Sequence, residues 1–100
     1  MKQDIFDVRG LHIVITGGAS GIGLAAAQEL AGRGAVLDIW DVKPESLAAA
    51  VSGPLRSFQE QITTRPVDVS DAEAVEAAAD AAWQGSPVDV LINCAGITSH

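Results

Sequence analysis

Short apolar runs alternate with alanine-rich segments along the whole chain. The runs are rich in valine, isoleucine and leucine and have the lengths of β-strands. They are residues 11–16, 35–40, 62–67 and 88–92. The segments between them have the lengths and apolar spacing of helices. They are residues 22–32, 44–51 and 72–84. Such alternation is typical of parallel strands joined by right-handed crossover helices, so the pattern predicts an α/β fold.

Glycine and proline mark the ends of these elements. Gly32 and Gly34 are placed to end the first helix in a left-handed turn, and Pro44 suits the first turn of the second helix. Residues 55–61 fit either a loop or a further helical turn. Pro66 cannot donate a hydrogen bond to a neighbouring strand, so we expect the third strand at an edge of the sheet. This position agrees with the strand order 3-2-1-4 of doubly wound sheets.

Two of the helices have an apolar side that predicts how they pack. In the first helix this side is predicted to contain Ile22, Ala25, Ala26 and Leu30. In the third helix it is predicted to contain Val75, Ala78, Ala79 and Ala82. Ser70 or Asp71 can cap the third helix. We interpret Trp40 and Trp83 as packing residues.

The order of the elements also predicts that the two faces of the sheet are covered unequally. The first two crossover helices should share one face, which leaves only the helix at residues 72–84 for the other. Part of that second face and the edge of the fourth strand should therefore lack cover. An uncovered apolar face and an open strand edge both favour association with another molecule.

The segment TGGASGIG, residues 16–23, joins the first strand to the first helix. Its glycines allow the backbone to turn sharply and to approach a ligand or a neighbouring strand closely. The first N–H groups of the following helix lack partners within the helix, and with the helix dipole they form a site for a diphosphate. No acidic residue lies between Asp7 and Glu29 to oppose such a group. An ordinary tight turn without a ligand is the alternative interpretation.

An acidic residue after the second apolar run supports the ligand interpretation. Asp41 follows the glycines at about the 20-residue distance of the acid that binds the adenosine ribose in dinucleotide-binding folds. A solvated acid after a strand is the alternative. A P-loop would need Gly-Lys-Ser or Gly-Lys-Thr in the turn, and neither is present, so a nucleoside triphosphatase is not expected.

These motifs, followed in order by DV at residues 68–69 and NCAG at residues 93–96, resemble the N-terminal part of a classical short-chain dehydrogenase/reductase. The resemblance extends from about Gly10 to the last residue. It implies a Rossmann-like doubly wound parallel sheet of strand order 3-2-1-4, of which this chain holds the first four strands and their crossover helices. Residues 1–100 would then be the N-terminal part of a single NAD(P)-binding domain.

The resemblance also implies which residues bind the cofactor. They are Gly17, Ser20, Gly21, Ile22, Gly23, Asp41, Asp68, Val69, Asn93, Ala95 and Gly96. Gly17, Gly21 and Gly23 would shape the turn over the pyrophosphate. Ser20 and Ile22 would lie where side-chain and backbone donors reach the phosphates or the adjacent ribose, and Thr16 would brace the turn. Asp68 and Val69 would hold adenine, although Asp68 also fits a turn or a helix cap. The last three would approach the nicotinamide ribose, and Cys94 stands where the family has a second asparagine.

Asp41 is the residue from which we predict whether the cofactor is NAD or NADP. Its carboxylate could accept both adenosine ribose hydroxyls, whereas a 2′-phosphate would meet like charge at a cost of roughly 1 to 4 kcal/mol. This favours NAD over NADP, and Lys43 nearby could soften the preference. The resemblance thus implies an NAD-dependent oxidoreductase that transfers a hydride between a secondary alcohol or ketone and nicotinamide.

Catalysis in the resembling family uses a serine, a tyrosine and a lysine downstream of the NCAG segment, and this sequence contains no tyrosine. No catalytic residue is therefore assigned, and the 100-residue segment alone is expected to be inactive. The alternative is a non-catalytic NAD-binding or sensing module that acts through a partner. A methyltransferase on the same type of sheet is less favoured because its ligand has no diphosphate for the glycine turn.

Composition limits the partners and the location. The net charge of −7 opposes binding to nucleic acid or an anionic membrane, so we expect a small-molecule partner. The resemblance implies that this partner is an alcohol or ketone substrate. The single cysteine, Cys94, allows no intrachain disulfide, fits a reducing compartment and is interpreted as a small buried hydrophobe. The sequence shows no metal-ligand cluster, signal-peptide core or bilayer-spanning apolar run. We expect a cytoplasmic protein, and the resemblance implies a homo-oligomer, a dimer or tetramer, for the complete protein.

Overall fold

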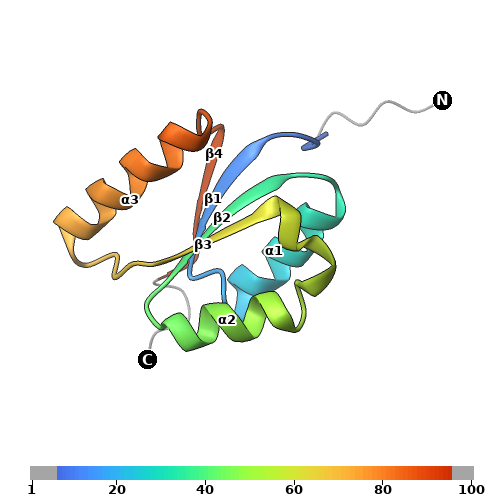
Figure 1. Cartoon of the computed structure of the whole chain (residues 1–100), viewed down its shortest axis with the longest axis horizontal. Helices are drawn as coiled ribbons and strands as arrows, with labels where there is room; N and C mark the ends of the chain where they lie inside the picture. The colour runs from blue at the N-terminus through green and yellow to red at the C-terminus, as the bar shows by residue number, and fades with distance from the viewer. Residues whose placement is uncertain (1–6, 96–100) are drawn as a thin grey trace.

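The computed structural model describes residues 7–95 and shows one four-stranded parallel sheet (Figure 1). Its strands are β1 (His12–Thr16), β2 (Val36–Asp41), β3 (Ile62–Pro66) and β4 (Val90–Asn93). They lie in the order β3-β2-β1-β4, with every neighbouring pair parallel. The predicted order 3-2-1-4 is confirmed, and Pro66 ends an edge strand as expected.

The helices cover the sheet in two unequal layers. They are α1 (Gly21–Gly32), α2 (Pro44–Ser52), the 3-10 helix η1 (Arg56–Gln61) and α3 (Ala72–Gly85). Figure 1 shows α1 and α2 on one side of the sheet and α3 on the other. The segment directly before β3 forms η1, so the helical alternative for residues 55–61 is confirmed over a loop.

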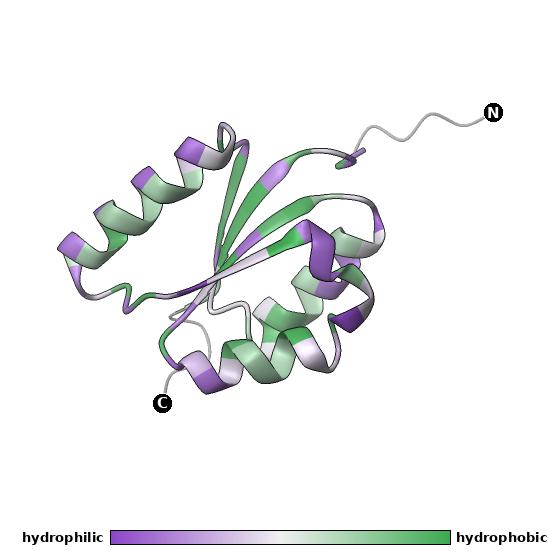
Figure 2. Ribbon diagram, viewed as in Figure 1, coloured by the Kyte–Doolittle hydropathy of each residue, from purple (hydrophilic) through white to green (hydrophobic). Residues whose placement is uncertain are grey.

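The face under α1 and α2 holds the larger core. Its largest fully buried side chains are Ile13, Ile15, Leu37, Ile39 and Leu55. Figure 2 shows the hydrophobic strands beneath these helices. The predicted apolar side of α1 is wrong by one position, because Gly23, Ala27 and Ala31 are its buried residues and Ile22 is 55% exposed. Small residues face the sheet, since they let the helix backbone lie close to it.

The opposite face packs against α3 through a smaller cluster. Val14 and Trp40 from the sheet contact Ala78 and Ala82 of α3, so the predicted side of this helix is confirmed. The carboxylate of Asp71 caps α3 by accepting hydrogen bonds from two first-turn N–H groups. The packing prediction holds for Trp40, which is buried, but is wrong for Trp83, which is 55% exposed.

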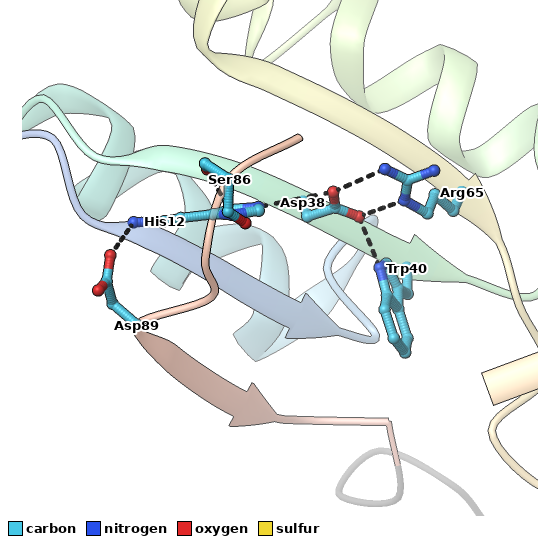
Figure 3. A network of polar contacts seen from close by, with 6 residues as sticks. All are labelled: His12, Asp38, Trp40, Arg65, Ser86 and Asp89. Carbon is cyan, nitrogen blue, oxygen red and sulfur yellow. Dashed lines mark hydrogen bonds and ion pairs between the residues drawn. The ribbon is translucent and has the colours of Figure 1, made fainter. Parts of the chain in front are cut away.

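A buried carboxylate joins β2 to β3 beneath α3 (Figure 3). Asp38 is 2% exposed, and the guanidinium of Arg65 donates to both of its oxygens at 2.8 and 3.1 Å. The indole N–H of Trp40 adds a third hydrogen bond at 2.6 Å. Because an unpaired buried charge is costly, these three donors explain how an acid is accommodated inside the sheet layer.

His12 connects the same region to the loop between α3 and β4 (Figure 3). Its Nδ1 lies 3.0 Å from the carbonyl oxygen of Ser86 and 2.9 Å from the hydroxyl of that residue. Its backbone N–H donates to the carboxylate of Asp89, and the Asp89 N–H donates back to the carbonyl of His12. These reciprocal bonds hold the entry of β4 beside the start of β1.

The far side of β4 and the adjoining face of the sheet are open among the described residues. Leu91 on β4 is 63% exposed and Val90 is 37% exposed. The prediction that the edge of the fourth strand lacks cover is therefore confirmed for residues 7–95. No helix in that range is long and apolar enough to cross a membrane.

The Asp38 ion pair gives a first prediction about stability. We expect Asp38→Asn to lower the free energy of unfolding by about 3 kcal/mol, because it leaves the Arg65 charge without its carboxylate in a largely buried place. Urea denaturation followed by circular dichroism measures the change. The matched control is Asp80→Asn on the exposed side of α3, with an expected change within about 0.5 kcal/mol. Equal effects of the two variants would contradict the role given to Asp38.

Candidate functional site

The glycine turn lies between β1 and α1, at the carboxyl edge of the sheet. Gly17 and Gly21 have φ values of +68° and +57°, a left-handed backbone region that glycine adopts without strain. The N–H groups of Gly17 and Gly18 both donate to the carbonyl of Trp40, at 2.7 and 3.3 Å. The turn is therefore tied to the end of β2.

Gly23 brings the first turn of α1 directly against this loop. A Cβ atom on residue 23 would lie 2.0 Å from the carbonyl oxygen of Gly17, far inside contact distance. Gly18, which the sequence reading did not assign to the site, is similarly confined, since its Cβ would lie 2.7 Å from the side chain of Ile39. The backbone cradle thus exists only with glycine at these positions.

The amino end of α1 has the features of an anion site. Ser20 precedes the helix with an extended backbone, and its side chain makes no capping hydrogen bond. No acidic residue lies in the first turn. The first N–H groups of a helix have no partners within it and carry partial positive charge, so this end suits a diphosphate.

Asp41 lies beside the same turn, as the last residue of β2. One carboxylate oxygen accepts from the N–H of Ala19 at 3.1 Å, and the other accepts from the N–H of Val42 at 2.8 Å. A carboxylate offers about four acceptor positions, so these two bonds orient the group and leave capacity for ribose hydroxyls. Ala19 was missed as the partner that positions this acid, because backbone N–H contacts across a fold leave no mark in the sequence.

Asp68 follows β3 and is also brought to this edge, since the N–H of Val67 donates to the carbonyl of Asp41. Its Oδ1 accepts from the hydroxyl and the N–H of Ser70, at 2.7 and 3.0 Å. These hydrogen bonds lower the pKa of the exposed carboxyl below its usual value. The turn interpretation of Asp68 is confirmed by this geometry, while its contact with adenine, and that of the exposed Val69, stay predictions.

Thr16 braces the segment after β4. Its hydroxyl donates to the side-chain oxygen of Asn93 at 2.5 Å and accepts from the N–H groups of Cys94 and Ala95, at 3.1 and 3.3 Å. Cys94 is 6% exposed, in line with its interpretation as a small buried hydrophobe. The predicted residue Gly96 lies outside the described residues.

The carboxyl edge therefore gathers the predicted positions from all four strands. Parallel α/β sheets bind ligands in the crevice at this edge, where the order of strands reverses, here between β1 and β4. The turn, the α1 amino end and Asp41 form the part of the site that the described residues define best. Within residues 7–95, no group of three or more histidine, cysteine or carboxylate side chains could hold a metal ion.

Comparison with known proteins decides the family. The family model described as short chain dehydrogenase matches residues 11–100, which is most of the chain. The chain belongs to the short-chain dehydrogenase family. A human relative, 3-hydroxyacyl-CoA dehydrogenase type-2, is 43% identical over 91 residues, covering 90% of this chain and 33% of the relative. The chain spans about a third of the length of the relatives that it matches.

Solved structures of short-chain dehydrogenases share the fold. A Burkholderia phymatum short-chain dehydrogenase/reductase in complex with NAD has a TM-score of 0.79 and 34% identity, over 87% of this chain and 31% of that one. L-sorbose reductase from Gluconobacter frateurii, complexed with NADPH and L-sorbose, has a TM-score of 0.73 and 31% identity, over 84% and 32%. The family thus includes structures with either nicotinamide cofactor, so likeness alone does not choose between them.

The contact between α1 and the glycine turn can be tested by adding one methyl group. We expect Gly23→Ala to lower the free energy of unfolding by about 3 kcal/mol, because the new Cβ must displace the Gly17 carbonyl. Gly85→Ala is the control, since its Cβ meets nothing within 4 Å. That variant should be neutral or more stable by up to about 1 kcal/mol. Thermal unfolding measures both, and a Gly23→Ala protein as stable as the wild type would refute the contact.

The turn at Asp68 can be tested by titration. Ser70→Ala removes the hydroxyl that stabilises the carboxylate, so the pKa of Asp68 should rise toward its usual value. Carboxyl-detected NMR between neutral and acidic pH reads this pKa directly. In the wild type the carboxylate should stay ionised to lower pH than in the variant. Ser57→Ala, at an exposed serine of η1, should leave the pKa of Asp68 unchanged.

Proposed function

We propose that this chain is the cofactor-binding part of an NAD-dependent short-chain dehydrogenase. One observation carries the proposal: the all-glycine cradle formed where Gly23 packs on Gly17, beside the amino end of α1 and the carboxylate of Asp41. The cradle provides backbone close to a ligand, the helix end provides N–H donors for a diphosphate, and Asp41 provides acceptors for the adjoining ribose. These three parts fit one half of a dinucleotide.

The preference for NAD over NADP rests on Asp41. A 2′-phosphate on the adenosine ribose would approach a carboxylate that the N–H groups of Ala19 and Val42 hold in place. The repulsion between that phosphate and the Asp41 carboxylate, at the effective dielectric constant of a protein surface, amounts to roughly 1 to 4 kcal/mol. Lys43, two residues further on, is exposed and could offset part of it. We therefore propose a preference for NAD rather than complete exclusion of NADP.

The remaining predicted residues belong to the same proposal. Asp68 and Val69 would contact adenine, and the segment that Thr16 braces, from Asn93 to Ala95, would lie beside the nicotinamide ribose. Gly96 would take part there as well. When bound, NAD supplies the hydride acceptor, and these residues hold its rings in a defined orientation. The 100 residues contain no tyrosine, so the proton transfer of the family must come from elsewhere in a complete enzyme.

The reaction proposed for the complete protein is hydride transfer between a secondary alcohol or ketone and nicotinamide. Relatives that are named as dehydrogenases support it, including 3-hydroxyacyl-CoA dehydrogenase type-2 and a 2,3-dihydro-2,3-dihydroxybenzoate dehydrogenase from Bacillus subtilis. These names do not favour the alternative of a non-catalytic sensing module. A cytoplasmic location is part of the proposal, supported by the single cysteine, which allows no intrachain disulfide and fits a reducing compartment. A homo-oligomer is also proposed, on the family resemblance alone.

Calorimetric titration with NAD and NADP tests the role of Asp41. We expect the wild-type chain to bind NAD at least about tenfold tighter than NADP, since tenfold corresponds to about 1.4 kcal/mol. Asp41→Asn should bring the two affinities within about threefold, because it removes the charge and keeps the size of the side chain. Asp80→Asn, at an exposed acid on α3, should leave the ratio unchanged. Tighter binding of NADP by the wild type would show that Asp41 does not select the cofactor.

A further inference from the structure

Three consecutive N–H groups of the glycine turn donate to the end of β2. Those of Gly17 and Gly18 share the carbonyl oxygen of Trp40. The N–H of Ala19 donates instead to a carboxylate oxygen of Asp41, at 3.1 Å. A backbone carbonyl is present whatever residue occupies a position, but a carboxylate is not. The third bond therefore makes the geometry of the turn depend on the side chain at position 41.

The N–H of Ala19 lies where the loss of its acceptor is costly. Ala19 is 7% exposed and belongs to the apolar core under α1 and α2. Within residues 7–95 its N–H has no acceptor other than Asp41. A buried donor that loses its acceptor costs free energy comparable to a lost hydrogen bond. Without the carboxylate, the turn is expected to favour conformations that direct this N–H toward water.

The same bond lies directly before the helix that would receive the diphosphate. Ala19 is two residues before Gly21, where α1 begins. Ser20 occupies the N-cap position, but its side chain makes no capping hydrogen bond. A capping side chain normally satisfies an N–H of the first turn and helps to fix where the helix starts. At α1 the bond from Ala19 to Asp41 fixes the chain at this point instead, from the neighbouring strand.

We propose that Asp41 is also a positioning residue, which holds the glycine turn in the form that binds the diphosphate. This inference rests on the proposed function, since it concerns the same nucleotide site. It means that binding of a diphosphate depends on Asp41 even when the ligand has no ribose hydroxyl for the carboxylate to bind. Substitutions of Asp41 that admit NADP therefore weaken both cofactors, unless the new side chain keeps an acceptor for the Ala19 N–H.

Two uncharged variants separate the two roles of Asp41. Asp41→Asn and Asp41→Ala both remove the charge, but of the two side chains only asparagine keeps an oxygen that can accept from the Ala19 N–H. The probe is 2′,3′-dideoxyadenosine diphosphate, which keeps adenine and the diphosphate and lacks both ribose hydroxyls. In calorimetric titration of the 100-residue chain, we expect Asp41→Ala to bind this probe at least about fivefold more weakly than Asp41→Asn. A factor of this size corresponds to one lost hydrogen bond.

Amide hydrogen exchange followed by NMR reads the bond without any ligand. The Ala19 N–H should exchange slowly in the wild type and in Asp41→Asn, and at least about tenfold faster in Asp41→Ala, because only that variant leaves the N–H without an acceptor. Asp80→Asn and Asp80→Ala, at an exposed acid on α3, are the matched control pair. These two should differ by less than about twofold in both measurements. If Asp41→Ala does not fold, Asp41→Leu replaces it, since leucine has nearly the size of asparagine and no acceptor.

The outcomes distinguish this inference from the proposed function. If the wild type binds ADP but the two Asp41 variants bind the dideoxy probe equally, Asp41 recognises hydroxyls alone and the positioning role is refuted. Equal exchange of the Ala19 N–H in the two variants refutes it as well. A wild-type chain that binds neither ADP nor NAD would refute the proposed function, and this inference with it.

Discussion

The carbonyl oxygen of Gly17 and the first turn of α1 lie so close together that no side chain fits between them. A Cβ on residue 23 would come within 2.0 Å of that oxygen. This approach determines where α1 starts relative to β1, and therefore where its unpaired N–H groups point. The carbonyl of Trp40 holds the same loop from the side of β2 by accepting two N–H groups. The position of Asp41, one residue further, follows from that contact.

The two faces of the sheet are stabilised in different ways, and β2 takes part in both. Leu37 and Ile39 point into the apolar core under α1 and α2, whereas Asp38 and Trp40 point toward α3. On the α3 side a bidentate ion pair with Arg65 replaces part of the apolar packing. The α3 face is therefore held partly by hydrogen bonds whose donors and acceptors must be aligned. The face under α1 and α2 is held by close packing of apolar side chains, which depends on their size and shape. The less covered α3 face also carries the exposed carboxylates of α3 itself, among them Glu73, Glu76 and Asp80.

The order and bounds of the elements were largely predictable because they depend on local properties. Apolar runs, helix-ending glycines and Pro66 are read directly from the chain, and each matches the structure to within two residues. The buried side of α1 was misjudged, because the spacing of apolar residues does not reveal that the smallest ones, such as Ala27, face the sheet. Trp83 was misjudged for a related reason. Its size indicates packing, but the residue is 55% exposed among residues 7–95.

The sequence by itself determined the parallel α/β order, the glycine turn and the acid at the end of β2, since each depends on residue type and spacing along the chain. It could not show that Asp41 is held by the N–H of Ala19, that Thr16 braces the turn after β4, or that Asp38 and Arg65 meet. These contacts join positions on different elements through backbone atoms or single side-chain pairs, which no periodic pattern encodes. Only the tertiary structure decided them, because only the folded register of the four strands brings those atoms within reach of one another.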